Sequence, residues 1–124
     1  MNEPLAGLRV LVVEDEFLLA EDLQREAEAA GATVVGPVPS LAQAMELSAE
    51  ARLDCAILDI NLQGEMVFPL ADALQARHIP FVFISGYAGR EMVPRHAGAR
   101  LFAKPIDFTA VFRALRQSIP SPPA

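Results

Sequence analysis

The sequence predicts an α/β fold, a doubly wound parallel sheet of five strands with helices on both faces. Short apolar runs of strand length alternate along the chain with segments whose apolar residues recur at helical spacing. Such alternation is typical of parallel sheets, and right-handed crossovers leave few possible topologies. Because Pro37 lies in the second run and cannot donate to a strand ladder, we expect that strand at an edge and the strand order 2-1-3-4-5.

Length and charge narrow the class of protein. Of the 124 residues, 52% are hydrophobic and 21% charged, so we expect a single domain, 1–124, with its core at about 8–117 and a proline-rich tail at 118–124. A net charge of -6 without a basic cluster argues against a nucleic-acid surface. The short apolar runs and an acidic amino terminus without a signal-peptide pattern predict a cytoplasmic protein with no membrane segment. Cys55 is the single cysteine, and we expect a reduced core thiol.

The five expected strands are rich in apolar and β-branched residues. They are residues 9–13, 33–38, 55–58, 81–84 and 100–103. The third run shows no alternation of polar and apolar residues, which is typical of a central strand that is covered on both faces. This run ends on Asp59, and Gly64 marks the loop that follows it.

Four segments carry an apolar stripe at helical spacing. The stripes are Leu19, Leu23, Ala27 and Ala30; Leu41, Ala44, Met45 and Ser48; Val67, Leu70, Ala71 and Leu74; and Phe108, Val111, Phe112 and Leu115. Gly31 is expected to end the first helix, and Ser40 with Gln43 forms a capping box that opens the second. Pro69 falls in the first turn of the third helix, where proline is tolerated, and the last helix is expected to begin near Asp107.

The connection at residues 88–99 departs from this regularity. Pro94 removes a donor and restricts Val93, so a helix can begin near it but cannot run through it. Gly89 and Gly98 loosen the flanks of the segment. We therefore expect this connection to be a short helix or a mobile segment.

Polar side chains follow four of the expected strands at their carboxyl ends. Glu14 and Asp15 follow the first strand, Asp59 the third, Ser85 the fourth and Lys104 the fifth. These four strands are neighbours in the predicted order, so the side chains should meet at one edge of the sheet. Three carboxylates there would repel one another, and Mg²⁺, which prefers oxygen ligands, would relieve the repulsion. An ammonium and a hydroxyl beside a nucleophilic carboxylate would complete a site for a phosphoryl group.

With these residues in this order, the chain resembles the receiver domains of two-component response regulators over about Leu8 to Gln117. The resemblance implies that Asp59 is the phosphoacceptor and that Glu14 and Asp15 bind Mg²⁺ together with Asp59. It also implies that Asn61, two residues after Asp59, offers its backbone carbonyl to the metal.

The resemblance extends to the residues that would respond to phosphorylation. Ser85 matches the switch hydroxyl, and Lys104 would pair with the phosphoryl group. The peptide bond between Lys104 and Pro105 is expected to be cis. Most receivers carry an aromatic switch residue three positions before this lysine. Here that position is Leu101, with Phe102 one step later, so we expect no rotating aromatic at the usual place. Gln63 stands where many receivers carry a proline.

A short motif indicates a subclass and a partner. The stretch Phe83-Ile84-Ser85-Gly86-Tyr87 resembles the Phe-Ala-Thr-Gly-Tyr motif of single-domain bacterial regulators, with two of the five positions different. That subclass is often linked to sensor histidine kinases of the HWE and related types. The implied role is a stand-alone receiver that takes phosphate from such a kinase and acts on a downstream protein. A phosphate sink, a relay step and an allosteric adaptor fit these residues equally.

Two other classes of function fit parts of the sequence. An enzyme of the haloacid dehalogenase kind, a Mg²⁺-dependent phosphatase, would also use an aspartate nucleophile, but it needs a second aspartate where this chain has Asn61. A flavin or nucleotide module would need a glycine-rich loop after the first strand, which is lacking. We therefore expect that the chain is not an enzyme and catalyses only its own phosphorylation and dephosphorylation. His78 and His96 are possible phosphohistidines, but their context favours loop residues.

Overall fold

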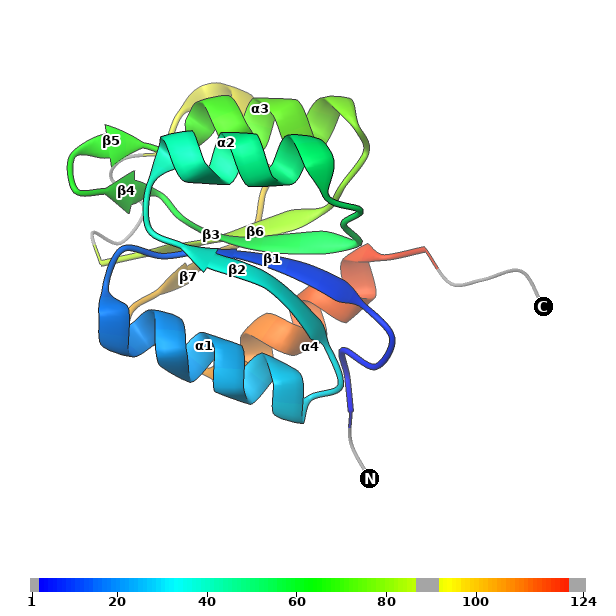
Figure 1. Cartoon of the computed structure of the whole chain (residues 1–124). Coiled ribbons are helices and arrows are strands. Elements are labelled where there is room, and N and C mark those ends of the chain that lie inside the picture. The colour runs from blue at the N-terminus through cyan, green and yellow to red at the C-terminus, as the bar shows by residue number, and fades with distance from the viewer. Residues whose placement is uncertain (1–2, 87–91, 121–124) are drawn as a thin grey trace.

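A five-stranded parallel sheet lies between two layers of helices (Figure 1). This computed structural model describes residues 3–86 and 92–120. The sheet has the order β2-β1-β3-β6-β7, formed by β1 (Arg9–Val13), β2 (Thr33–Val38), β3 (Cys55–Asp59), β6 (Phe81–Ser85) and β7 (Leu101–Ala103). Helices α2 (Leu41–Glu50) and α3 (Phe68–Ala76) cover one face, and α1 (Phe17–Ala29) and α4 (Phe108–Ser118) cover the other. The predicted fold and strand order are confirmed.

The central and edge strands lie where the sequence predicted them. Every residue of β3 is buried, and β3 pairs with β1 on one side and β6 on the other. Strand β2 pairs with β1 alone and carries Pro37 at the sheet edge, where the missing donor is harmless. Burial raises the pKa of the Cys55 thiol to about 12, in agreement with an inert core residue.

Alternation along the strands divides the apolar core into two clusters. The α2–α3 core lies under those two helices and includes Leu58 and Phe83. The α1–α4 core lies on the opposite face of the sheet and includes Ile57 and Ile84. Adjacent residues of β3 and β6 therefore pack into opposite layers, which fixes the register of both strands.

The expected helix boundaries are set by local side-chain and backbone chemistry. The hydroxyl oxygen of Ser40 accepts a hydrogen bond from the Gln43 N–H at 3.2 Å, and a carboxylate oxygen of Asp107 accepts one from the Ala110 N–H at 3.2 Å. Gly31 follows α1 with φ +98°, and a Cβ there would lie 2.7 Å from the Ala6 Cα. Only glycine fits this helix end without strain.

A small hairpin follows β3, where the sequence predicted only a loop. It pairs β4 (Asn61–Leu62) with β5 (Glu65–Met66). The two turn residues, Gln63 and Gly64, have φ values of 56° and 93°, the positive values that a two-residue hairpin of this twist requires. The hairpin turns the chain at the carboxyl edge and fixes Asn61 there (Figure 1).

The connection between β6 and β7 contains a short 3₁₀ turn, Pro94–His96, within its described residues 92–100. The expectation of a short helix near Pro94 is confirmed for this part, whereas Tyr87 and Gly89 lie outside the described residues. His96 lies in this connection, in agreement with the expectation of a loop residue, but its side chain is only 2% exposed, which the sequence did not indicate. Its ring stacks on Phe68, with 5.9 Å between the ring centroids.

His96 also fastens this connection to α3 through a polar contact. Its Nε2 lies 2.7 Å from Oδ1 of Asp72, and the Arg95 guanidinium binds both oxygens of the same carboxylate at 2.9 and 3.0 Å. His78 also lies in a connection, just after α3 with φ 58°, as expected, but its side chain is exposed. Within residues 3–86 and 92–120, no helix has the combined length and apolar character of a bilayer span.

Candidate functional site

The carboxyl edge of the sheet gathers the predicted acidic residues and the lysine. Glu14 directly follows β1, Asp59 is the last residue of β3, and Lys104 directly follows β7. Lys104 Nζ lies 2.9 Å from Oδ2 of Asp59 and 3.2 Å from Oε1 of Glu14. The peptide bond between Lys104 and Pro105 is cis, as predicted. The parallel topology thus brings residues from the two halves of the chain into direct contact.

Burial dominates the acid–base properties of the two central carboxyls. It raises the pKa of Glu14 from 4.5 to about 8, and the neighbouring Asp59 charge acts in the same direction. Burial likewise raises the pKa of Asp59, against the opposing hydrogen bond from Lys104. For Lys104 burial works to lower the pKa, but its hydrogen bonds to Glu16 and Asp59 hold that pKa above the usual range. A cation bound at this edge would therefore stabilise the ionised carboxylates against the cost of burial and against their mutual repulsion.

A divalent cation fits the acidic cluster. One carboxylate oxygen from each of Glu14, Asp15 and Asp59 lies within 4.8 Å of the others. Oε1 of Glu14 is buried and receives no hydrogen bond from the residues that the structure describes. A hard cation such as Mg²⁺ would bind this oxygen in addition to the Lys104 ammonium 3.2 Å away, and the ligand atoms are all oxygen, as Mg²⁺ prefers.

A cavity of about 450 Å³ opens beside Asp59. It is lined by Asp15, Glu16, Asp59, Asn61, Gln63, Gly64, Gly86 and Lys104. The Asn61 N–H donates a hydrogen bond to Oδ1 of Asp59 at 3.2 Å, which orients the carboxylate toward this space. Ser85 is buried at the end of β6, directly before Gly86, so its hydroxyl belongs to the same edge of the sheet. The cavity is large enough for a phosphoryl group with its bound water.

Glu16, which the sequence did not indicate as a site residue, also belongs to this site. Its Oε1 lies 2.9 Å from Lys104 Nζ, and its backbone N–H donates to Oε2 of Glu14 at 2.9 Å. The third acid of the run Glu14-Asp15-Glu16 was a visible signal, but an exposed acid at a helix start is usually a capping or solvated residue. The contact with Lys104 depends on the fold and spans most of the chain.

Leu101, at the usual aromatic switch position, and Phe102, one residue later, face opposite sides of the sheet. Leu101 packs against the α2–α3 core, which also receives Val93 and Ala99 from the connection before β7. Phe102 packs against the α1–α4 core, with the Arg100 guanidinium 5.3 Å from its ring centroid. Phe102 therefore does not replace the ring that Leu101 lacks.

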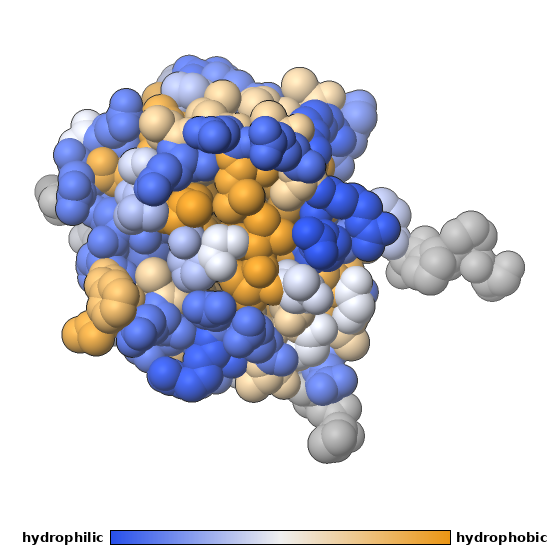
Figure 2. Space-filling model, viewed as in Figure 1, coloured by the Kyte–Doolittle hydropathy of each residue, from blue (hydrophilic) through white to orange (hydrophobic). Residues whose placement is uncertain are grey.

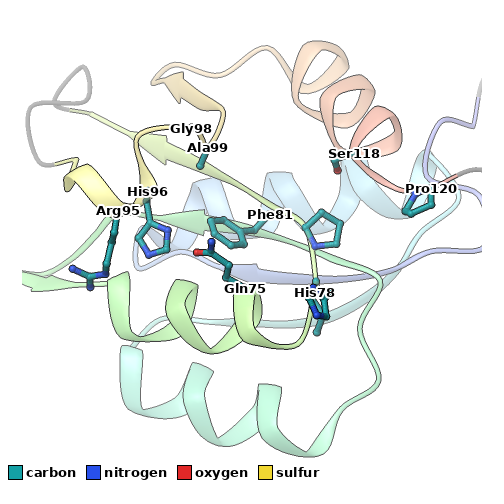
Figure 3. A pocket seen from close by; sticks show the side chains of 11 residues that line it. Gln75, His78, Phe81, Arg95, His96, Gly98, Ala99, Ser118 and Pro120 are labelled. Atoms are coloured by element: carbon teal, nitrogen blue, oxygen red, sulfur yellow. The ribbon is translucent and has the colours of Figure 1, made fainter.

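A second cavity of about 480 Å³ lies away from the acidic cluster, beside the beginning of β6 (Figure 3). Its walls include Gln75 of α3, Phe81 of β6 and the Arg95–His96 turn. Arg95 and His96 are both bound to Asp72. Among the described residues, the walls of this cavity are largely apolar and include no carboxylate. The phosphorylation site that the sequence predicts lies instead at the carboxyl edge of the sheet.

The fold and the acidic edge define a doubly wound α/β signalling domain, and comparison with known families agrees. The family model for the response regulator receiver domain matches residues 10–116, and the chain belongs to this family. Receiver domains bind Mg²⁺ at an acidic pocket and are phosphorylated by histidine kinases, and this structure has a cluster of Glu14, Asp15 and Asp59 at the carboxyl edge of its sheet.

Individual relatives are similar along most of this chain. The phyllosphere-induced regulator PhyR of Methylorubrum extorquens is 30% identical over 114 residues, which cover 89% of this chain and 43% of that protein. The solution structure of SdrG from Sphingomonas melonis Fr1 is 36% identical with a TM-score of 0.77, covering 90% of this chain and 97% of that one. The anti-anti-sigma factor PhyR from Bartonella quintana is 25% identical with a TM-score of 0.75, covering 90% and 46%. The chain spans about half the length of the curated relatives it matches.

Proposed function

We propose that this chain is a stand-alone receiver that accepts a phosphoryl group on Asp59 from a sensor histidine kinase, in a Mg²⁺-dependent reaction, and then changes its partner-binding surface. The observation that carries the proposal is the environment of the Asp59 carboxylate. It is buried, one oxygen accepts from the Asn61 N–H, and the other lies 2.9 Å from Lys104 Nζ. Glu14 and Asp15 stand beside it.

This environment suits phosphoryl transfer to a carboxylate. A bond forms between an Asp59 oxygen and phosphorus while the bond from phosphorus to the donor histidine nitrogen breaks and leaves its electron pair on nitrogen. Mg²⁺ held by Glu14, Asp15, Asp59 and the Asn61 carbonyl would neutralise charge on the phosphoryl oxygens. Lys104 pairs with one of these oxygens and the Ser85 hydroxyl donates to another, so the orientation of the phosphoryl group is fixed.

An apolar projection beside the site suits a protein as the phosphodonor. Phe17 and Leu18 are 72% and 74% exposed, and they follow Glu16 in the first turn of α1. Figure 2 shows an apolar projection at its lower left, where the matching view of Figure 1 has one end of α1. Large exposed apolar side chains next to a polar site are typical of a protein contact. We assign this contact to the histidine kinase, of the HWE or a related type. Replacing both residues with serine should slow transfer from the kinase and leave the rate with acetyl phosphate unchanged.

The output surface in this proposal is the 92–99 segment together with β7 and α4. Leu101 lacks the ring that would rotate, so phosphorylation acts by moving Ser85 toward the phosphoryl group and ordering residues 92–99. The described part of that connection is fastened to α3 by His96 and Asp72. A downstream protein would recognise the ordered form.

Intact-mass spectrometry after treatment with acetyl phosphate and Mg²⁺ tests the proposal. One added phosphoryl group is expected on the wild-type chain and none on Asp59→Asn, which keeps the side-chain shape but lacks the nucleophilic oxygen. Equal uptake by the two proteins would refute the assignment of Asp59. Steady turnover of p-nitrophenyl phosphate without a stable phosphoprotein would instead support the phosphatase alternative.

A further inference from the structure

The ammonium of Lys104 has a third partner that the acidic metal cluster does not include. Oε1 of Glu16 lies 2.9 Å from Lys104 Nζ, as close as Oδ2 of Asp59. The Glu14 and Asp59 side chains are almost completely buried, whereas that of Glu16 is 63% exposed. Lys104 is therefore held between a buried side and a solvent side, and Glu16 forms the solvent side.

The position of Glu16 is fixed by its backbone. Its N–H donates to Oε2 of Glu14, and its carbonyl accepts from the Ala20 N–H at 2.9 Å as the first turn of α1 begins. Glu16 also lines both the cavity around Asp59 and an adjoining cavity that contains Leu18 and Pro105. Its carboxylate thus lies at the exposed side of the site, in the wall of the cavity through which a group can approach Asp59 from solvent.

Glu16 therefore acts on two charges at once. It competes with an incoming phosphoryl oxygen for Lys104, because an ammonium that is paired with a carboxylate must loosen that pair to bind another anion. It also adds one negative charge at the entrance, and the repulsion it exerts grows with the charge of the approaching molecule.

We propose that Glu16 is a positioning residue that holds Lys104 at the mouth of the phosphorylation site and selects against strongly anionic small phosphodonors. The inference rests on the proposed function of Asp59. It implies that a histidine-bound phosphoryl group on a docked protein is favoured over free dianionic donors. Contacts such as those offered by Phe17 and Leu18 compensate a docked protein for the repulsion, and a free donor has no such compensation.

Two small donors of different charge separate this role from a structural one. Near neutral pH acetyl phosphate is a dianion, whereas phosphoramidate carries one net negative charge because its nitrogen is protonated. In both reactions an Asp59 oxygen forms a bond to phosphorus. The leaving acetate takes the electron pair of the broken P–O bond, and the leaving ammonia takes that of the broken P–N bond. The leaving groups differ too, but that difference cancels when each variant is compared with wild type on the same donor, which leaves the charge of the donor at the entrance.

The experiment compares wild type, Glu16→Gln and the control Glu21→Gln, with Mg²⁺ present. Glu21 is an exposed acid farther along α1, so the control removes the same charge from the same helix without touching Lys104. For Glu16→Gln we expect about a threefold to tenfold faster reaction with acetyl phosphate and less than about a twofold change with phosphoramidate. The control should change neither rate, and added salt should shrink the effect.

A second readout needs no phosphorylation. Lys104 is the only lysine of the chain, so its reaction with a limiting amine reagent can be followed by peptide mass spectrometry in the metal-free protein. Glu16→Gln should label Lys104 at least about twofold faster, because the Glu16 carboxylate no longer pairs with the ammonium on its solvent side. Glu21→Gln should match wild type.

The outcomes separate the two proposals. The first outcome concerns the ratio of the rate with acetyl phosphate to the rate with phosphoramidate. If both proteins accept phosphate and this ratio is the same in wild type and Glu16→Gln, the selection role alone is overturned. Equal labelling of Lys104 would overturn its positioning by Glu16. A wild-type chain that accepts no phosphoryl group from either donor would overturn the function of Asp59 itself, and with it the selection role.

Discussion

The metal-free protein should lose stability as the pH rises, and Glu14 should cause most of the loss. The pKa of Glu14 is about 8 in the folded protein, where burial disfavours the charged form, and close to 4.5 once the chain unfolds. Between these values the folded state holds a proton that the unfolded state has released. The free energy of unfolding is therefore highest below pH 4.5 and falls as the pH rises through 8.

The size of the effect follows from the same two pKa values. At ~1.4 kcal/mol for each pKa unit, the change from 4.5 to about 8 sets a ceiling of ~5 kcal/mol. Water entering the site and a closer approach of Lys104 would both lower the cost of ionising Glu14. We therefore expect a measured loss of about 2–3 kcal/mol, which is a large part of the stability of a small domain.

The variant Glu14→Gln should remove this loss because its side chain cannot ionise. Urea unfolding in EDTA at pH 5 and pH 9 measures it, and a loss of 2–3 kcal/mol corresponds to a midpoint about 1–2 M urea lower for wild type at pH 9. Glu46→Gln, the same change on the exposed side of α2, is the control and should follow wild type. A wild-type urea midpoint that is the same at pH 5 and pH 9 would refute the reasoning. So would a midpoint that falls as much in Glu14→Gln as in wild type.

Three other results are expected. Millimolar Mg²⁺ should raise the melting temperature of wild type by mass action, and Asp15→Ala should abolish the shift; an equal shift in the variant would exclude Asp15 as a ligand. His96→Ala should lower the free energy of unfolding by about 2–4 kcal/mol in urea, because it removes a buried stacked ring, whereas His78→Ala at an exposed position should cost less than about 1 kcal/mol. Hydrogen exchange in residues 92–99 should slow when beryllofluoride binds, and strong protection that is equal in both states would contradict the ordering mechanism.

The fold was predictable because its signals are local in the chain. Gly31, Ser40 and Asp107 mark helix ends through contacts within a few residues, and each lies at the boundary that the sequence indicated. Pro37 identified the edge strand through its missing donor, which fixed the strand order once the crossovers were taken as right-handed. The acidic pair, Asp59 and Lys104 then met at one edge because parallel strands end together.

The features that the sequence did not reveal depend on distant partners or on ambiguous turns. Gln63 with Gly64 forms a two-residue hairpin turn, but glutamine lacks the preference for positive φ that makes asparagine a clear signal. His96 is buried only because Phe68 and Asp72, both more than twenty residues earlier, provide its stacking and polar partners. Glu16 looks like an ordinary solvated helix start until the fold places Lys104 beside it.

The same packing offers a physical route from Asp59 to the proposed output segment. Strand β6 carries Ser85 at the phosphorylation edge and Phe83 two residues earlier, and the Phe83 ring meets His96 edge-on with 5.9 Å between centroids. Phe81 of the same strand also contacts His96, at 5.8 Å. A shift of Ser85 toward a phosphoryl group would therefore move the surface on which the His96 ring rests. In this chain aromatic contacts therefore join β6 to the 3₁₀ turn, whereas β7 carries Leu101 at the usual aromatic position.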